Sequence, residues 1–113
     1  IAVLVVVGAW QALTGSTRVL LEAAPAGLDV AAVRDALAAE PDVEAVHHVH
    51  LWSLASETPA LSAHVVLAGD TWTLHDAQGR IDELKALLAT RFGIAHATLE
   101  VECHECEAAP EHA

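Results

Sequence analysis

Apolar and polar residues repeat with different periods along this chain, and each period predicts a type of element. Residues 96–102 alternate with period two, which is typical of a half-buried strand. Residues 42–54 and 61–67 are rich in side chains that suit a pleated surface, and residues 55–59 between them are turn-forming. The pattern therefore predicts three strands, of which the first two form an antiparallel hairpin.

Two other stretches repeat apolar residues with the period of a helix. Asp29 is a suitable N-cap for a helix over residues 30–40, which Pro41 ends. Thr73 and Asp76 form a capping box at the start of a second helix, and Gly93 is placed to end it. The order helix, strand, strand, helix, strand predicts an α+β fold, with two helices on one face of a three-stranded sheet.

The first 13 residues are apolar at nearly every position. A bilayer span takes about 20 such residues, so we interpret this segment as the end of a transmembrane helix, with Trp10 at the membrane interface. The alternative is a buried amphipathic helix, but seven apolar residues in a row leave no polar face. Since the chain also lacks methionine, we expect it to be a piece of a longer polypeptide.

Charge narrows the choice of ligands. Five basic and 16 acidic residues give a formal net charge of -11, which repels nucleic acid and favours cations. Two cysteines are too few for a disulfide framework and indicate metal or redox chemistry in the cytosol.

Histidines gather on the predicted hairpin. His47, His48 and His50 lie on its first strand and His64 on its second, where a cross-strand neighbour is about 5 Å away. A single histidine on a solvated strand is usually only a polar residue, but four on one hairpin favour a metal site. Further possible ligands follow on and after the third strand: His96, Glu100, Glu102, Cys103, His104 and Cys106.

Strict alternation conflicts with part of this interpretation. A regular strand would point His47 toward the core and place His48 and His50 on the opposite face, unless a bulge shifts the frame. The Cys103-x-x-Cys106 pair is open to three interpretations: a metal clamp, a redox dithiol or a reduced tail. Redox is the weakest, because acidic neighbours do not lower the pKa of a thiol. Nothing pairs an open metal position with a general base, so we do not expect an enzyme.

Several motifs resemble the cytoplasmic C-terminal domain of the cation diffusion facilitator family, which exports zinc and other divalent metals in exchange for protons. The stretch from His47 to Trp52 resembles the family motif His-Asp-Leu-His-x-Trp, with His48 in place of the usual aspartate. Residues 61–65 and 92–102 are similar to the second histidine strand and the closing signature. Residues 16–22 are similar to the link that leaves the sixth membrane helix.

The resemblance implies a ferredoxin-like or metallochaperone-like αββαβ domain that dimerises beneath a membrane exporter. It implies a first zinc site at His47, His64 and Glu102 and a second at His96, Cys103 and Cys106. His48, in place of the usual aspartate, and His50 are further candidate ligands of the first site in this chain. Zn²⁺ is the expected ion, although Co²⁺, Cd²⁺, Ni²⁺ and copper suit the same ligands.

We therefore divide the chain into three parts: the end of a membrane helix with its linker (1–24), a metal-binding dimerisation domain (25–102) and an acidic tail (103–113). The predicted function is a metal-sensing homodimerisation domain of a proton-coupled zinc exporter, on the cytoplasmic side of the inner cell membrane. The alternative is a freestanding metal chaperone or storage domain, which would have no use for the apolar start.

Overall fold

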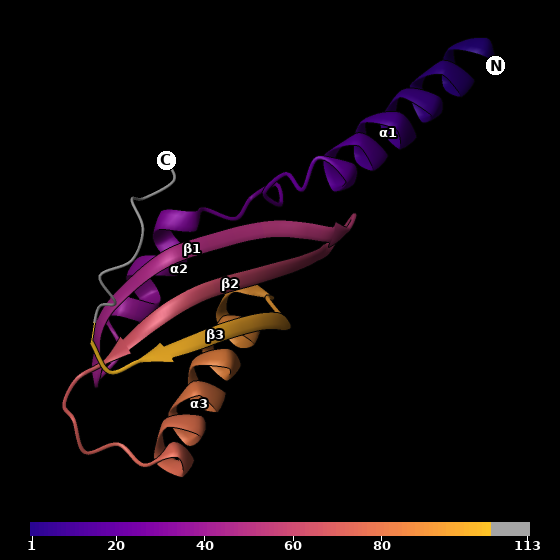
Figure 1. Cartoon of the computed structure of the whole chain (residues 1–113). Coiled ribbons are helices and arrows are strands. Elements are labelled where there is room, and N and C mark those ends of the chain that lie inside the picture. The colour runs from indigo at the N-terminus through magenta and orange to yellow at the C-terminus, as the bar shows by residue number, and fades with distance from the viewer. Residues whose placement is uncertain (105–113) are drawn as a thin grey trace.

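A computed structural model of the chain describes residues 1–104 (Figure 1). Its elements are helix α1 (Ala2–Leu20), helix α2 (Val30–Ala38), strand β1 (Val43–Ala55), strand β2 (Thr58–Leu67), helix α3 (Leu74–Phe92) and strand β3 (His96–Glu102). After α1, this is the predicted order of helix, strand, strand, helix, strand. The predicted α+β fold is confirmed.

The three strands form one sheet in the order β1-β2-β3. Strands β1 and β2 are antiparallel, whereas β2 and β3 are parallel. Parallel neighbours need a crossover connection, and α3 supplies it. The central strand β2 therefore contacts both the strand that precedes it and the strand that ends the fold.

The hairpin turn is tighter than the sequence predicts. Thr58 and Pro59 belong to β2, so the turn consists of residues 56–57 rather than 55–59. Proline has no N–H to donate to a neighbouring strand. Because β3 pairs with β2 only from Ala60 onward, the central strand can contain Pro59 without losing a ladder hydrogen bond to β3.

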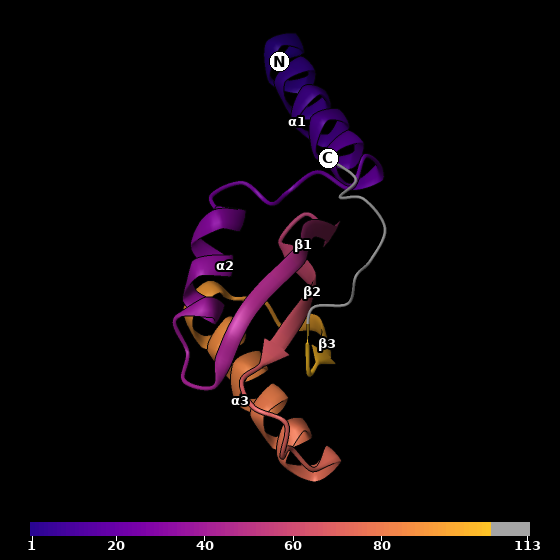
Figure 2. The same cartoon turned by 60° about the vertical axis from the view of Figure 1, so that its left-hand side comes forward.

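Helices α2 and α3 cover one face of the sheet (Figure 2). Alternate residues of β2 point into this layer and are buried against both helices. The core they form consists mainly of Val33 and Leu37 of α2, Leu61, Ala63, Val65 and Leu67 of β2, Ile81, Leu84 and Leu88 of α3, and Ile94. The other residues of β2, including Ser62 and His64, lie on the opposite face, which we call the open face.

The helix ends follow the predicted caps. Asp29 accepts a hydrogen bond from the Ala31 N–H at 3.0 Å, and Thr73 accepts one from the Asp76 N–H at 3.1 Å. Gly93 ends α3 in the left-handed conformation, with φ of 68°. Helix α2 stops at Ala38 rather than at residue 40, because the residue before a proline avoids helical geometry.

Helix α1 extends away from the rest of the molecule and buries none of its residues (Figure 1). This contradicts the alternative of a buried amphipathic helix. Among the described residues, α1 is the one helix that is long and apolar enough to cross a membrane. Its 19 residues correspond to about 28 Å, close to the thickness of a hydrocarbon core.

Candidate metal centre

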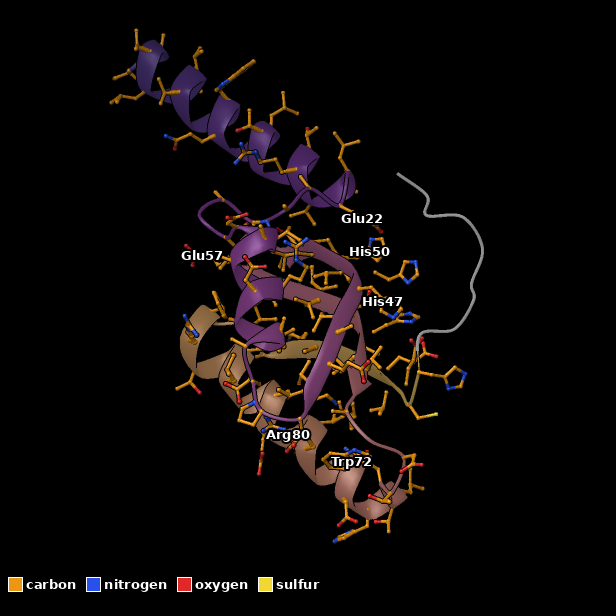
Figure 3. All side chains as sticks on the ribbon, turned by 90° about the vertical axis from the view of Figure 1, so that its left-hand side faces the viewer. Glu22, His47, His50, Glu57, Trp72 and Arg80 are labelled. Atoms are coloured by element: carbon orange, nitrogen blue, oxygen red, sulfur yellow. The ribbon has the colours of Figure 1, made fainter. Side chains whose placement is uncertain are left out.

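Strand β1 contains a bulge at its histidines. His47 pairs with His64 and His50 pairs with Ser62. Between these two pairs β1 advances by three residues and β2 by only two, so β1 contains one extra residue. His48 lies in this bulge with φ of 49°, a left-handed conformation that a residue with a side chain adopts at a cost of about 1 kcal/mol. As a result His47 and His50 both lie on the open face (Figure 3). The position of His47 expected from strict alternation was therefore wrong.

His47, His64 and Glu102 meet on the open face, one from each strand. His47 Nε2 is 2.8 Å from Glu102 Oε2, and His64 Nδ1 is 2.7 Å from Glu102 Oε1. The Glu102 side chain is only 7% exposed, against 21% for His47 and 32% for His64. One carboxylate thus holds two imidazoles by charge-assisted hydrogen bonds from a nearly buried position.

These contacts favour the ionised form of Glu102. The hydrogen bond to His64 is the largest influence and lowers the pKa of the carboxyl group. Burial acts in the opposite direction, and the hydrogen bond to His47 adds to the lowering. The pKa of Glu102 lies below its ordinary value of 4.5, so the carboxylate is charged at neutral pH.

His48 adds a third ring to the pair. Its Nδ1 is 2.9 Å from His47 Nδ1, and its ring centroid is 4.8 Å from that of His47 and 5.0 Å from that of His64. The three rings each offer one nitrogen as a possible ligand atom, and these three nitrogens lie within 4.8 Å of one another. His64, Glu100 and Glu102 form a second such group, in which His64 Nε2 is 3.5 Å from Glu100 Oε2.

The donors suit a particular class of metal. Imidazole nitrogen and carboxylate oxygen are ligands for zinc and for the neighbouring metals cobalt, nickel and copper. Zinc–nitrogen bonds of about 2.0–2.1 Å place the donors of a tetrahedral site about 3.3 Å apart. The donor atoms of neighbouring residues lie 2.7 to 2.9 Å apart, which is shorter than this, so some of these contacts would lengthen when an ion binds.

Other predicted ligands do not join this cluster. His50 is exposed on the open face, beside a hollow that it lines with Glu22 and Trp52, and belongs to neither group of possible ligands among the described residues. His96 begins β3 and Cys103 follows its end, so about 23 Å of extended strand separates them. This distance keeps His96 and Cys103 of one chain apart, and the second site, which the family resemblance implies with a ligand from a neighbouring subunit, stays a prediction.

Cys103 lies beside His104 instead, with 3.2 Å between Sγ and Nδ1, and both residues are exposed. Cys106 lies outside the described residues. Glu100 was a possible ligand by sequence but was not assigned to a site. The parallel pairing of β2 with β3 brings it opposite His64, and this register was not predicted from the sequence.

Known proteins resemble this chain over most of its length. Residues 25–104 match the family described as cation efflux protein, cytoplasmic domain. Zinc transporter ZitB of Escherichia coli (strain K12) is 35% identical over 107 residues, which cover 94% of this chain and 33% of ZitB. The chain spans between about a fifth and a third of the length of the curated relatives it matches.

Two solved structures share the fold. The metal-bound C-terminal domain of the CzcD transporter from Cupriavidus metallidurans is 36% identical with a TM-score of 0.57, and the match covers 66% of this chain and 99% of that one. The zinc form of CzrB is 27% identical with a TM-score of 0.59, and the match covers 77% of this chain and 97% of that one.

Proposed function

This chain belongs to the cation efflux protein family, with its cytoplasmic domain at residues 25–104, and we propose that this domain senses zinc for a proton-coupled efflux transporter. The observation that carries the proposal is the meeting of His47, His64 and Glu102 on the open face. ZitB is a zinc transporter and the CzcD domain is metal-bound, which supports a divalent cation as the ligand.

The first site is built from one residue of each strand. His47 and His64 supply ring nitrogens, and Glu102 keeps both rings oriented and adds negative charge. A bound Zn²⁺ would supply two positive charges and fix the relative positions of its ligands. Because β1 and β3 are the two edges of the sheet, the hydrogen bonds of Glu102 to His47 and His64 connect all three strands at the site.

The open face is also the surface that we assign to homodimerisation. It carries histidines and the half-buried Trp52, and α2 and α3 pack on the other side of the sheet. A net charge of -11 on each chain opposes association, and bound divalent cations offset part of that repulsion. Zinc binding and dimerisation should therefore strengthen each other by the same coupling free energy.

Helix α1 is the proposed connection to the membrane part. It is long and apolar enough to span a bilayer, and it buries none of its side chains. Residues 1–24 would then be the end of the last transmembrane helix and its linker, with the domain on the cytoplasmic side of the inner membrane. A freestanding chaperone or storage protein would have no use for such a helix.

Zinc titration of the whole chain in detergent micelles tests the site. His64→Ala should abolish or strongly weaken zinc binding, whereas His75→Ala, on the exposed first turn of α3, should leave it unchanged. Equal affinities of the two variants would reject the site. Sedimentation of residues 25–113, which contain every buried core residue, should show a dimer with zinc. A zinc-saturated protein that stays monomeric would favour the chaperone function.

A further inference from the structure

His48 is held against the first site by an unusual piece of backbone. Its left-handed conformation within the β1 bulge places its ring beside both His47 and His64. A regular strand would point the neighbours His47 and His48 to opposite faces. The bulge therefore gathers two consecutive histidines at one place, and this rearrangement has an energetic cost.

We propose that His48 is a direct metal ligand, so that His47, His48 and His64 hold a zinc-like divalent cation with three imidazoles from a single chain. This inference rests on the proposed function, because it concerns the ligands of the same site. It makes His48 a ligand on the evidence of its position, and it gives Glu102 the role of orienting the rings of His47 and His64 through hydrogen bonds.

The contacts of His47 show how this arrangement works. Its Nε2 faces Glu102 at 2.8 Å, and its Nδ1 faces His48 at 2.9 Å. The ring can therefore donate its Nε2–H to the carboxylate and keep Nδ1 as a ligand atom on the side of His48. A carboxylate that accepts from the far nitrogen of a metal-bound histidine is a recurrent arrangement, which fixes the tautomer and the ring orientation.

Two consequences distinguish this site from one made of two histidines and a carboxylate. Its donors come from β1 and β2 of one chain, so binding does not require a ligand from a partner chain. Three nitrogen donors also favour zinc, nickel, cobalt and copper(II) over magnesium, calcium and manganese, which prefer oxygen.

The experiment uses His48→Asn and His50→Asn in the whole chain in detergent micelles. Asparagine tolerates a left-handed conformation, so it removes the imidazole of His48 without changing the bulge. His50→Asn is the matched control, because it removes an exposed imidazole of the same strand outside the cluster. Loss of a residue that only orients a ligand weakens metal binding by about 10 to 100-fold. Because His48 is a ligand itself, we expect His48→Asn to weaken zinc binding by about 100-fold or more. His50→Asn should leave the affinity unchanged.

Copper(II) gives an independent readout, since pulsed electron paramagnetic resonance counts the imidazoles bound to the ion. The unmodified chain and His50→Asn should show three imidazoles, and His48→Asn should show two. Glu102→Gln should still show three while binding zinc about 10 to 100-fold more weakly, because it removes an orienting group and not a ligand. His48→Gly, which accepts positive φ freely, repeats the test if the asparagine variant does not fold.

Each result has a clear meaning. An unchanged imidazole count and an unchanged affinity in His48→Asn would overturn the role of His48, while loss of binding in His64→Ala would leave the proposed function standing. Unchanged binding in both variants would overturn the proposed function as well.

Discussion

Replacing Glu102 with glutamine removes a negative charge from between two imidazoles while keeping the size and shape of the side chain. In the metal-free protein the carboxylate makes contacts of 2.8 Å with His47 and 2.7 Å with His64. A hydrogen bond to a charged group contributes about 1.5–3 kcal/mol to the stability of the fold. In the variant, the glutamine oxygen can still accept one of the two hydrogen bonds, but as a weaker bond between neutral groups. We therefore expect Glu102→Gln to lower the free energy of unfolding by about 1.5–3 kcal/mol at pH 7.

The pH dependence of this difference has a definite sign. The pKa of Glu102 is lower in the folded protein than its ordinary value of 4.5, mainly because of the hydrogen bond to His64. The ionised carboxylate therefore stabilises the fold fully above pH 4.5, and this contribution disappears as the pH falls through the folded pKa. The difference between the unmodified protein and Glu102→Gln should shrink in that acidic range.

Urea unfolding followed by tryptophan fluorescence, in the presence of a chelator, measures the difference at each pH. Glu100→Gln is the control, because Glu100 lies on the same strand but is 67% exposed and 3.5 Å from His64. We expect it to change stability by less than about 1 kcal/mol. A Glu102→Gln difference that stays constant between about pH 7 and pH 3 would refute the electrostatic explanation.

Three further predictions concern the ion, the assembly and the junction between α2 and β1. Zinc binding should release more protons at pH 6 than at pH 7, because ligation requires neutral imidazoles and the ordinary pKa of histidine is about 6.5. Calorimetry in buffers of different ionisation enthalpy counts these protons, and a count that does not rise between pH 7 and pH 6 would contradict histidine ligands. Zinc should tighten the dimer of residues 25–113 in sedimentation experiments, and His64→Ala should remove this effect, whereas an equal effect in that variant would place the coupling elsewhere. Arg80→Ala should lower the free energy of unfolding by about 1–3 kcal/mol, because the Arg80 side chain is only 12% exposed and its guanidinium binds Glu40, Glu83 and the Pro41 carbonyl. Urea unfolding measures this change, and unchanged stability would show that these contacts contribute little. Figure 3 labels the Arg80 side chain.

The elements were predictable because their signals are local. Asp29, Thr73 and Gly93 mark helix ends through short-range hydrogen bonds and backbone preferences, and the structure uses all three. Strand β3 has the predicted bounds because alternation over residues 96–102 is unbroken. Local chemistry of this kind does not depend on how the elements are arranged.

The candidate site was only partly predictable because it depends on strand register. The resemblance to a known family suggested His47, His64 and Glu102, and the structure brings these three side chains together. The bulge that allows this could be considered from the sequence but not located, since its position depends on packing along the whole hairpin. His96 lies at the opposite end of β3 from Glu102 and Cys103, so the sequence alone could not show how far apart these residues are in one chain.

The crossover through α3 also determines when Glu102 can reach the two histidines that it orients. His47 and Glu102 are 55 residues apart in the chain, and His64 and Glu102 are 38 residues apart. Contacts between such distant residues form only after the entropy cost of closing long loops has been met, so they are slow to appear during folding. Glu102 is the last residue of the last strand and has to emerge from the ribosome before it can reach the two histidines. A nascent chain would therefore orient these histidines on Glu102 only once the whole sheet is paired, which makes full affinity at the site, rather than occupancy alone, a readout of completed folding.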